Sequence, residues 1–215
     1  LDSLQVYKDL RILTDRPNDE LCKNYDHRLY GILKGNENCT VATWLEKAVN
    51  EINECFSSKI IPIIVGGTGM YLKALMEGLS EIPSISVNTK KKMKSHLEIH
   101  GLHYLYEKIL SNFPNSKISS NDKQRIIRSY SLLLETGKVL EEWQTKKKPL
   151  IKNINYKIIL TNMNREELYR AAELRVENMF KNEAVNEVKL LHKKRYDADL
   201  SIIKAIGVRE ISNFI

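Results

Sequence analysis

Two short apolar runs without polar alternation, at residues 60–65 and 156–161, stand out in the hydropathy pattern. A continuous apolar run is typical of a strand that is covered on both faces, as in a parallel sheet. Other segments repeat their apolar residues at helical spacing, namely 40–56, 123–136, 164–180 and 183–194. Because a helical segment leads directly into the run at 60–65, a strand, a crossover helix and a strand are expected as neighbours. The pattern therefore predicts an α/β fold with a parallel sheet core.

Several helix ends are marked by capping residues. Thr40 and Asn164 stand where N-caps are favoured, as does Asn121 or Ser120, and Gly137 is typical of the residue that follows a helix. The apolar side of two helices is expected to face the core. This predicts burial for Trp44, Phe56, Leu168, Tyr169, Ala172, Val176, Met179 and Phe180.

The character of the chain changes after Gly78. Residues 83–88 are typical of a linker, and basic helical stretches follow at about 88–98 and 101–111. We therefore predict a first part of the α/β core, a helical insertion and a second, mostly helical part of the core, with bounds at 1–82, 83–150 and 151–215.

Charge and composition narrow the possible partners. The chain carries 34 Lys and Arg against 27 Asp and Glu, a net charge of +7, with basic clusters at 90–94, 146–148 and 193–195. One cluster is usually a solvated surface, whereas three make nucleic acid a candidate partner. No window approaches the ~18 apolar residues of a membrane span and no signal peptide is visible, which predicts a cytoplasmic location without membrane contact. Three cysteines without CxxC spacing and five histidines without HExxH indicate reduced thiols and no metal site.

A glycine-rich turn, Gly66-Gly67-Thr68-Gly69, follows the first apolar run and precedes a helical segment. In a parallel sheet such a turn lies at the carboxyl end of a strand, where ligands bind, and its backbone N–H groups favour anions. A plain corner between strand and helix uses the same glycines. No Gly-Lys-Ser/Thr follows, so the turn is not a Walker loop.

Two further polar patterns each allow either a structural or a functional interpretation. Asp2-Ser3 is either a turn cap or a catalytic carboxylate placed at a strand exit. Gln124 and Arg128 lie one helical turn apart, either on a solvated face or on a surface that binds phosphates and base edges.

Taken together, these motifs resemble the tRNA dimethylallyltransferase (isopentenyl transferase) family. The matching segments occur in the family's order over essentially the whole chain: Asp2-Ser3-Leu4-Gln5-Val6-Tyr7, Gly66-Gly67-Thr68-Gly69-Met70-Tyr71, Gln124-Arg125-Ile126-Ile127-Arg128, Leu168-Tyr169 with Arg175-Val176, and Ala205-Ile206-Gly207-Val208-Arg209-Glu210. Each segment is a weak signal alone, and the ordered set is specific.

The resemblance implies a P-loop NTPase-like parallel sheet core with a helical, tRNA-binding insertion. The family moves a dimethylallyl group from dimethylallyl diphosphate to the N6 amine of the adenosine beside the tRNA anticodon, with Mg²⁺ accompanying the diphosphate. The resemblance implies three catalytic residues: Asp2 as general base, Thr68 and Arg175. It also implies that Asp2 and Thr68 contact the tRNA, and that Arg175, Gly66 and Gly67 bind the diphosphate. The further implied tRNA contacts are Ser3, Leu4, Gln5, Lys90, Gln124, Arg125, Ile126, Ile127, Arg128, Lys204 and Arg209.

Some features depart from the family's pattern. Its phosphate loop is expected upstream of Asp2 and its basic C-terminal segment beyond Ile215, and Ala171-Ala172 stand where Arg-Ile is common. We therefore expect a monomeric fragment of such an enzyme that is inactive by itself. The alternatives are a catalytically inactive RNA-binding module of the same fold and a P-loop-type small-molecule kinase.

Overall fold

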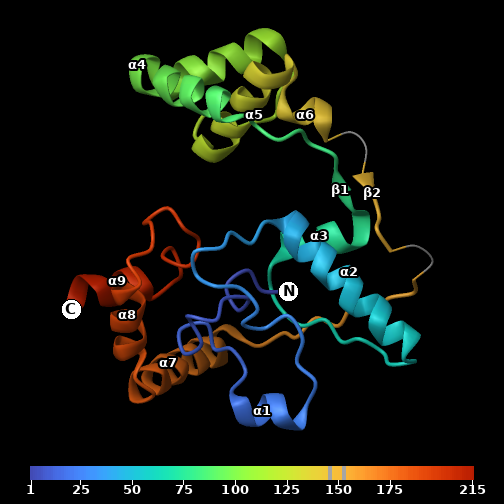
Figure 1. Cartoon of the computed structure of the whole chain (residues 1–215), viewed down its shortest axis with the longest axis vertical. Coiled ribbons are helices and arrows are strands. Elements are labelled where there is room, and N and C mark those ends of the chain that lie inside the picture. Colours follow the sequence, from blue (N-terminus) through green and yellow to red (C-terminus); the bar gives the residue numbers. More distant parts are fainter. Residues whose placement is uncertain (145–146, 152–153) are drawn as a thin grey trace. The chain divides into compact units, whose positions relative to one another are not determined.

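The computed structural model describes residues 1–144, 147–151 and 154–215 and divides the chain into two units (Figure 1). Unit 1 comprises Leu1–Met76 and Leu150–Ile215, and unit 2 comprises Glu77–Pro149. The helices of unit 1 are α1 (Asp19–Asn24), α2 (Val41–Ser57), α3 (Gly69–Glu77, which ends at the first residue of unit 2), α7 (Arg165–Lys181), α8 (Ala184–Lys193) and α9 (Val208–Phe214). Unit 2 contains β1 (Leu79–Ser80), α4 (Val87–Asn112), α5 (Lys123–Thr136), α6 (Leu140–Trp143) and β2 (Lys147–Lys148).

Helix α2 begins where the sequence predicts. The hydroxyl of Thr40 accepts the backbone N–H of Thr43 at 3.1 Å, which satisfies a donor that the helix itself leaves free. Trp44 is buried, as predicted, and stacks on Tyr71 of α3 with ring centroids 4.5 Å apart. Phe56, near the end of α2, is 43% exposed, so the prediction that it lies in the core is wrong. The apolar side of α2 is buried from Trp44 to Cys55, and Phe56 lies beside this buried side rather than on it.

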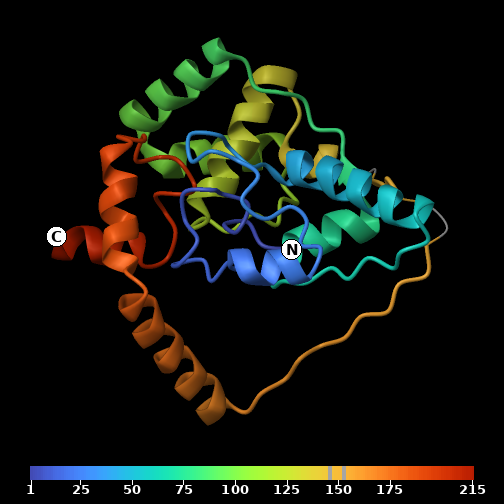
Figure 2. The ribbon, with the colours of Figure 1, turned by 60° about the horizontal axis from the view of Figure 1, so that its bottom comes forward.

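The two apolar runs that predict strands form no strand in the structure. Residues 60–68 and 154–164 lie outside any helix or strand, and both segments are drawn as loops in Figures 1 and 2. Ile61 and Ile159 are 85% and 79% exposed. A strand forms only where a neighbouring backbone pairs with it along several residues, and within the described residues no bridge joins either run to another segment. The predicted parallel sheet core is therefore not confirmed.

The strands that do form in the described part of the chain are short. β1 and β2 pair antiparallel, with Leu79 opposite Lys148, and an isolated parallel bridge joins Tyr7 to Leu33. The ion pair between Lys147 and Glu77 lies beside the ribbon. Lys146, part of a predicted basic cluster, lies outside the described residues.

Helix α7 corrects a second prediction. Asn164 caps it as predicted, its side chain accepting the N–H of Glu167 at 2.9 Å. No residue of α7 is buried, however. Met179 is half-buried against a cluster of α8 and α9, whereas the other side chains that were expected inside are exposed: Leu168, Tyr169, Ala172, Val176 and Phe180. An amphipathic helix buries its apolar side only where another element covers it.

Unit 2 is a helical unit with its own core. Helix α4 contains a break at Gly101 (φ +78°), so it consists of two helical stretches, as predicted. The side chain of Asp122 caps α5, one residue beyond the predicted cap, and Gly137 ends the helix in the left-handed conformation (φ +73°). The buried residues that hold α4, α5 and the segment before α6 together are Leu105, Ile109, Ile118, Ile126, Tyr130 and Val139.

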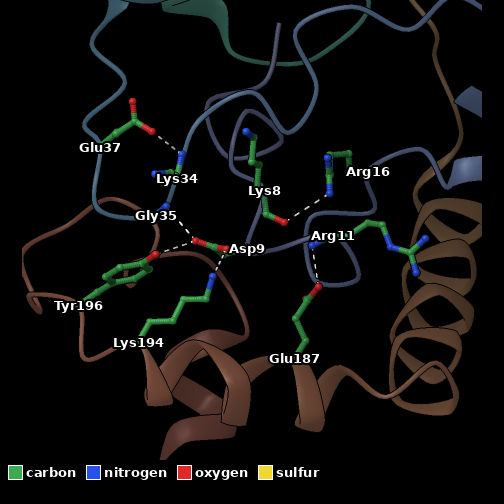
Figure 3. A network of polar contacts seen from close by, with 10 residues as sticks. All are labelled: Lys8, Asp9, Arg11, Arg16, Lys34, Gly35, Glu37, Glu187, Lys194 and Tyr196. Carbon is green, nitrogen blue, oxygen red and sulfur yellow. Dashed lines mark hydrogen bonds and ion pairs between the residues drawn. The ribbon is translucent and has the colours of Figure 1, made fainter.

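A polar network joins the N-terminal loops of unit 1 to its C-terminal helices (Figure 3). The carboxylate of Glu187 on α8 accepts the backbone N–H groups of Arg11, Ile12 and Leu13. Asp9 accepts the hydroxyl of Tyr196 at 2.9 Å and forms an ion pair with Lys194. These contacts fix the loop that follows the Asp2 segment.

Candidate functional site

Asp2 forms a turn with the residues that follow it. Its Oδ1 accepts the backbone N–H of Leu4 at 2.8 Å and that of Gln5 at 3.0 Å, so the carboxylate is held by its own loop. Asp2 is half-buried, and in the described part of the chain its Oδ2 has no hydrogen-bond partner. The turn-cap and the catalytic interpretations are therefore compatible, because one oxygen serves the turn and the other is free to bind a proton.

The glycine-rich turn lies beside this carboxylate. The backbone nitrogen of Leu1 donates to the carbonyl of Val65 at 2.6 Å, and the N–H of Thr68 donates to the carbonyl of Leu1 at 3.0 Å. Gly66 has φ +143°, and a Cβ on it would lie 2.5 Å from the Leu1 carbonyl oxygen. A side chain at residue 66 would thus separate the two segments, whereas Gly67 faces open space.

Thr68 connects the turn to α3. Its carbonyl accepts the N–H of Tyr71 at 2.9 Å, in the first turn of that helix. The ring of Tyr71 is buried against Trp44, and its hydroxyl donates to the Cys39 sulfur at 3.7 Å. The packing of α3 therefore fixes the position of Thr68. Thr68 in turn is bonded to Leu1, the residue directly before Asp2.

Two tyrosines lie within electrostatic reach of Asp2. Burial raises the pKa of Tyr30, and the negative charge of Asp2 raises it further. Burial is also the largest cause of the raised pKa of Tyr71, to which Cys39, Tyr7 and Asp2 add. Tyr30 packs edge-to-face on His27, with ring centroids 5.8 Å apart. Tyr30 and His27 were not predicted from the sequence, since no periodicity or spacing relates them to Asp2.

Gln5 holds the Asp2 turn to the next loop. Its side-chain amide donates to the carbonyls of Thr14 at 2.9 Å and Asp15 at 3.1 Å. Its own carbonyl accepts the N–H of Gly31 at 2.9 Å. In this structure Gln5, a predicted tRNA contact, therefore connects three segments: the Asp2 turn, the loop at Thr14–Asp15 and the loop at Gly31. Ser3 and Leu4 are half-buried within the same turn.

Arg175 lies on the exposed helix α7. Within the described residues, no hydrogen bond or ion pair connects it to the Asp2 turn or to Gly66 and Gly67. The structure therefore does not bring the predicted diphosphate contacts together.

The predicted RNA contacts of unit 2 divide by exposure. Gln124 and Arg128 are exposed on α5, and Arg125 is exposed but lies 3.4 Å from Asp122. Ile127 is half-buried. Ile126 is 0% exposed, because it is part of the core between α4 and α5. The expectation that Ile126 contacts tRNA is therefore wrong for its side chain, which instead fixes the helix that presents Gln124 and Arg128.

The remaining predicted cations lie on surfaces of their own units. Lys90 is exposed in the first turn of α4, in unit 2. In unit 1, Lys204 lies 3.5 Å from Asp199, and Arg209 is exposed on α9. Ala205 and Val208, which belong to the same motif, are buried and anchor it.

The described residues contain neither a cluster of metal ligands nor a membrane-spanning helix. Among the residues that the structure describes, no group of three His, Cys, Asp or Glu side chains is placed to hold a metal ion. In the same ranges, no helix combines the length and apolar character that crossing a membrane requires.

A protein-family model described as IPP transferase matches residues 5–215, almost the whole chain. The chain belongs to the IPP transferase family. Curated members of this family include the tRNA dimethylallyltransferase of Rickettsia felis, 35% identical over 219 residues, and that of Pelagibacter ubique, 36% identical over 216 residues. Both alignments cover 100% of this chain, and they cover 71% and 69% of the relatives.

Solved structures of IPP transferases share the fold. The tRNA isopentenylpyrophosphate transferase of Bacillus halodurans has a TM-score of 0.61 and 25% identity, over 99% of this chain and 66% of that one. The Staphylococcus epidermidis enzyme has a TM-score of 0.58 and 27% identity, over 99% and 70%. A eukaryotic dimethylallyltransferase acting on tRNA has a TM-score of 0.74 at 22% identity, over 99% and 55%, a likeness that concerns the fold alone.

The family resemblance inferred from the motifs is thus confirmed. Membership of this family of prenyl transferases supports transfer of a dimethylallyl group to tRNA as the activity. Neither an inactive RNA-binding module nor a small-molecule kinase is favoured.

Proposed function

We propose that this chain presents the N6 amine of the adenosine beside the tRNA anticodon to dimethylallyl diphosphate, with Asp2 as the general base. The observation that carries the proposal is the contact between the Asp2 turn and the turn at Gly66–Thr68 through Leu1. It holds the Asp2 turn, whose Oδ2 has no hydrogen-bond partner among the described residues, beside a hydroxyl residue and a glycine-rich backbone. Those are the groups that the removal of a proton and the binding of an acceptor nucleotide require.

The reaction forms one bond and breaks one. The N6 nitrogen attacks the allylic carbon, the bond between that carbon and the diphosphate oxygen breaks, and the electron pair leaves with the diphosphate. The proton on N6 passes to Oδ2 of Asp2, while Leu4 and Gln5 hold Oδ1 and fix the direction of the carboxylate. The base must leave its stack for its amine to reach this carboxylate.

Other residues position the substrates in this proposal. Thr68 contacts the acceptor nucleotide, and Gly67, which faces open space, admits a phosphate close to the backbone. Arg175 supplies positive charge to the leaving diphosphate. Because the described structure does not connect Arg175 with the Asp2 turn, this role requires α7 to approach the turn when substrate binds.

The helical unit binds the anticodon stem-loop in this proposal. Gln124 and Arg128 are exposed on one side of α5, and Lys90 adds charge on α4. Guanidinium and ammonium groups bind backbone phosphates, and an exposed amide reads base edges in an unstacked loop. Lys204 and Arg209 provide phosphate contacts from unit 1. We also propose that the protein acts as a monomer in the cytoplasm.

Mg²⁺ has no place of its own in the described residues, which contain no cluster of metal ligands. In this proposal the ion is held by the oxygens of the diphosphate, and no step of the reaction is assigned to it.

A chimera tests the proposal independently of where the chain begins and ends. In it, this chain replaces the matching segment of the Pelagibacter ubique tRNA dimethylallyltransferase, 69% of that enzyme. Incubated with labelled dimethylallyl diphosphate, Mg²⁺ and unmodified tRNA, the chimera is expected to label adenosine N6. A folded chimera that binds tRNA and transfers no label would contradict the proposal and favour an RNA-binding module.

A further inference from the structure

Arg16 is a cation whose charge nothing in the described chain neutralises. Among the described residues it takes part in no ion pair, and its Nε is buried without a hydrogen-bond partner. Within the described chain the guanidinium makes one hydrogen bond, from Nη2 to the carbonyl of Lys8, and this bond is long at 3.4 Å (Figure 3). A desolvated donor without a partner destabilises the folded protein, and a charged donor does so more strongly. Such a group therefore indicates an absent acceptor.

Two acids of the same network are already engaged (Figure 3). Both oxygens of Glu187 accept backbone N–H groups, and Asp9 is bound by Lys194 and Tyr196. Arg28 shows the opposite arrangement, since three carboxylates surround its guanidinium: Asp26, Glu51 and Glu54. The charge of Arg28 serves the fold, whereas the charge of Arg16 remains available.

Gly31 provides the surface against which the guanidinium lies. It has φ +59°, and a Cβ at this residue would lie 1.6 Å from Nη1 of Arg16. The absence of a side chain thus makes the space that Arg16 occupies. The guanidinium packs on backbone, which limits its rotamers without supplying an acceptor for Nε.

Arg16 shares its support with the proposed general base. The side chain of Gln5 donates to the carbonyls of Thr14 and Asp15, directly before Arg16, and the N–H of Gln5 donates to Asp2. The backbone of Arg16 is closed into a turn by its N–H, which donates to the carbonyl of Arg11 at 3.0 Å. One residue, Gln5, therefore fixes Asp2 and the Arg16 loop relative to each other.

We infer that Arg16 binds a phosphate oxygen of a substrate beside the Asp2 turn. A planar guanidinium suits phosphate, because it offers parallel N–H donors, including Nε, to two oxygens. The inference rests on the proposed function in that the phosphate belongs either to the tRNA backbone near the acceptor nucleotide or to the diphosphate of the donor.

Binding measurements on this chain test the inference and distinguish the two sources. The probes are a fluorescent anticodon stem-loop RNA and inorganic pyrophosphate. Arg16→Met removes the charge and keeps an apolar side chain of similar length. Arg16→Lys keeps the charge and removes the parallel N–H donors of the guanidinium. Lys8→Met, which removes an exposed cation from the same loop, is the matched control. Circular dichroism and thermal unfolding confirm that each variant is folded.

Arg16→Met is expected to weaken the affinity for one of the two probes about 10- to 100-fold, as the loss of one or two charge-assisted hydrogen bonds would. Arg16→Lys is expected to restore part of this affinity, and Lys8→Met to change it less than about threefold. A loss confined to RNA, with a salt slope reduced by about 0.7–0.9, identifies a backbone phosphate. A loss confined to pyrophosphate identifies the donor.

Unchanged affinity for both probes in folded Arg16→Met would overturn the inference and make Arg16 a packing residue. If Arg16→Met does not fold, Arg16→Gln, which keeps donors for the Lys8 carbonyl, decides the same question. Failure of the proposed function is a different result, in which the chimera transfers no prenyl group while Arg16 variants still lose phosphate affinity.

Discussion

Oε1 of Glu187 lies 2.6 Å from the backbone nitrogen of Arg11, although 176 residues separate the two in sequence. The same carboxylate accepts the N–H groups of Ile12 and Leu13 at 2.8 and 3.0 Å. Three consecutive donors of a loop are thereby satisfied by one side chain of α8. This loop continues the segment that carries Asp2, so α8 contributes to positioning the candidate site.

We expect Glu187→Ala to destabilise the protein by about 2–4 kcal/mol. The substitution leaves three partly buried N–H groups without an acceptor, and each unsatisfied donor costs about 1–3 kcal/mol when water cannot replace the lost bond. Chemical denaturation followed by circular dichroism measures the effect. Glu173→Ala, on the exposed side of α7, is the control and is expected to change stability by less than about 0.5 kcal/mol. Equal stability of the two variants would show that water satisfies the loop.

The Asp9 network predicts a loss of stability in acid. Burial by itself would raise the pKa of Asp9, but hydrogen bonds from Lys194, Gly35 and Tyr196 outweigh it and lower the pKa. A lowered pKa in the folded state stabilises above the unfolded value of about 3.9, and this contribution disappears as the pH falls through the folded value.

Wild type and Asp9→Asn are therefore expected to differ by about 1–2 kcal/mol at pH 7, a modest value because Lys194 is partly solvated. The difference should shrink as the pH falls below about 4, where the carboxyl becomes protonated first in the unfolded state, and should disappear only below the lowered folded pKa. Urea denaturation from pH 7 to pH 2.5 measures it, with the exposed Asp15→Asn as control. A difference that stays constant over this range would assign the effect to packing rather than charge.

The helices could be predicted from the sequence because their signals are local. Thr40, Asn164 and Gly137 each satisfy backbone groups within a few residues, and the structure places all three at helix ends. The strands could not be predicted from the sequence, since an apolar run such as 60–65 becomes a strand only when a second backbone pairs with it. The expected inner face of α7 failed for the same reason, because burial depends on a neighbour.

The candidate site was predictable only where family motifs contain its residues. Asp2 and Thr68 belong to such motifs, and the structure brings them together through Leu1. The contact between Glu187 and Arg11 joins distant residues by a hydrogen bond that leaves no periodic pattern. Tyr30 likewise approaches Asp2 only through the folded path of the loops. Long-range polar contacts of this kind require coordinates.

The exposed run after α2 predicts rapid backbone exchange. The N–H groups of Ile61, Ile63, Ile64 and Val65 donate to no carbonyl of the described chain. Native-state hydrogen exchange measured by NMR should therefore find little protection there, while Trp44 and Leu45 in α2 exchange slowly. Strong protection throughout residues 61–65 would show that this run is paired in a sheet.

The α5 surface predicts a salt-dependent contribution to RNA binding. Arg128 is exposed and, among the described residues, forms no ion pair, so its charge is available to a phosphate. Arg128→Ala is expected to reduce the log–log salt slope of anticodon stem-loop binding by about 0.7–0.9, with little change in stability. Lys117→Ala, an exposed cation of the same unit, is the control. An unchanged salt slope and affinity for Arg128→Ala would show that this side of α5 is a solvated surface that does not contact RNA.

The single-turnover rate of prenyl transfer by the chimera carrying Asp2→Asn tests the account most directly. Asparagine keeps an acceptor for the N–H groups of Leu4 and Gln5, so the turn is retained while the base is lost. The account predicts a rate about 10²–10⁴ lower than that of the unsubstituted chimera, with tRNA affinity unchanged. A rate within a few-fold of the unsubstituted chimera would contradict it, because the proton of the acceptor amine would then leave by another route.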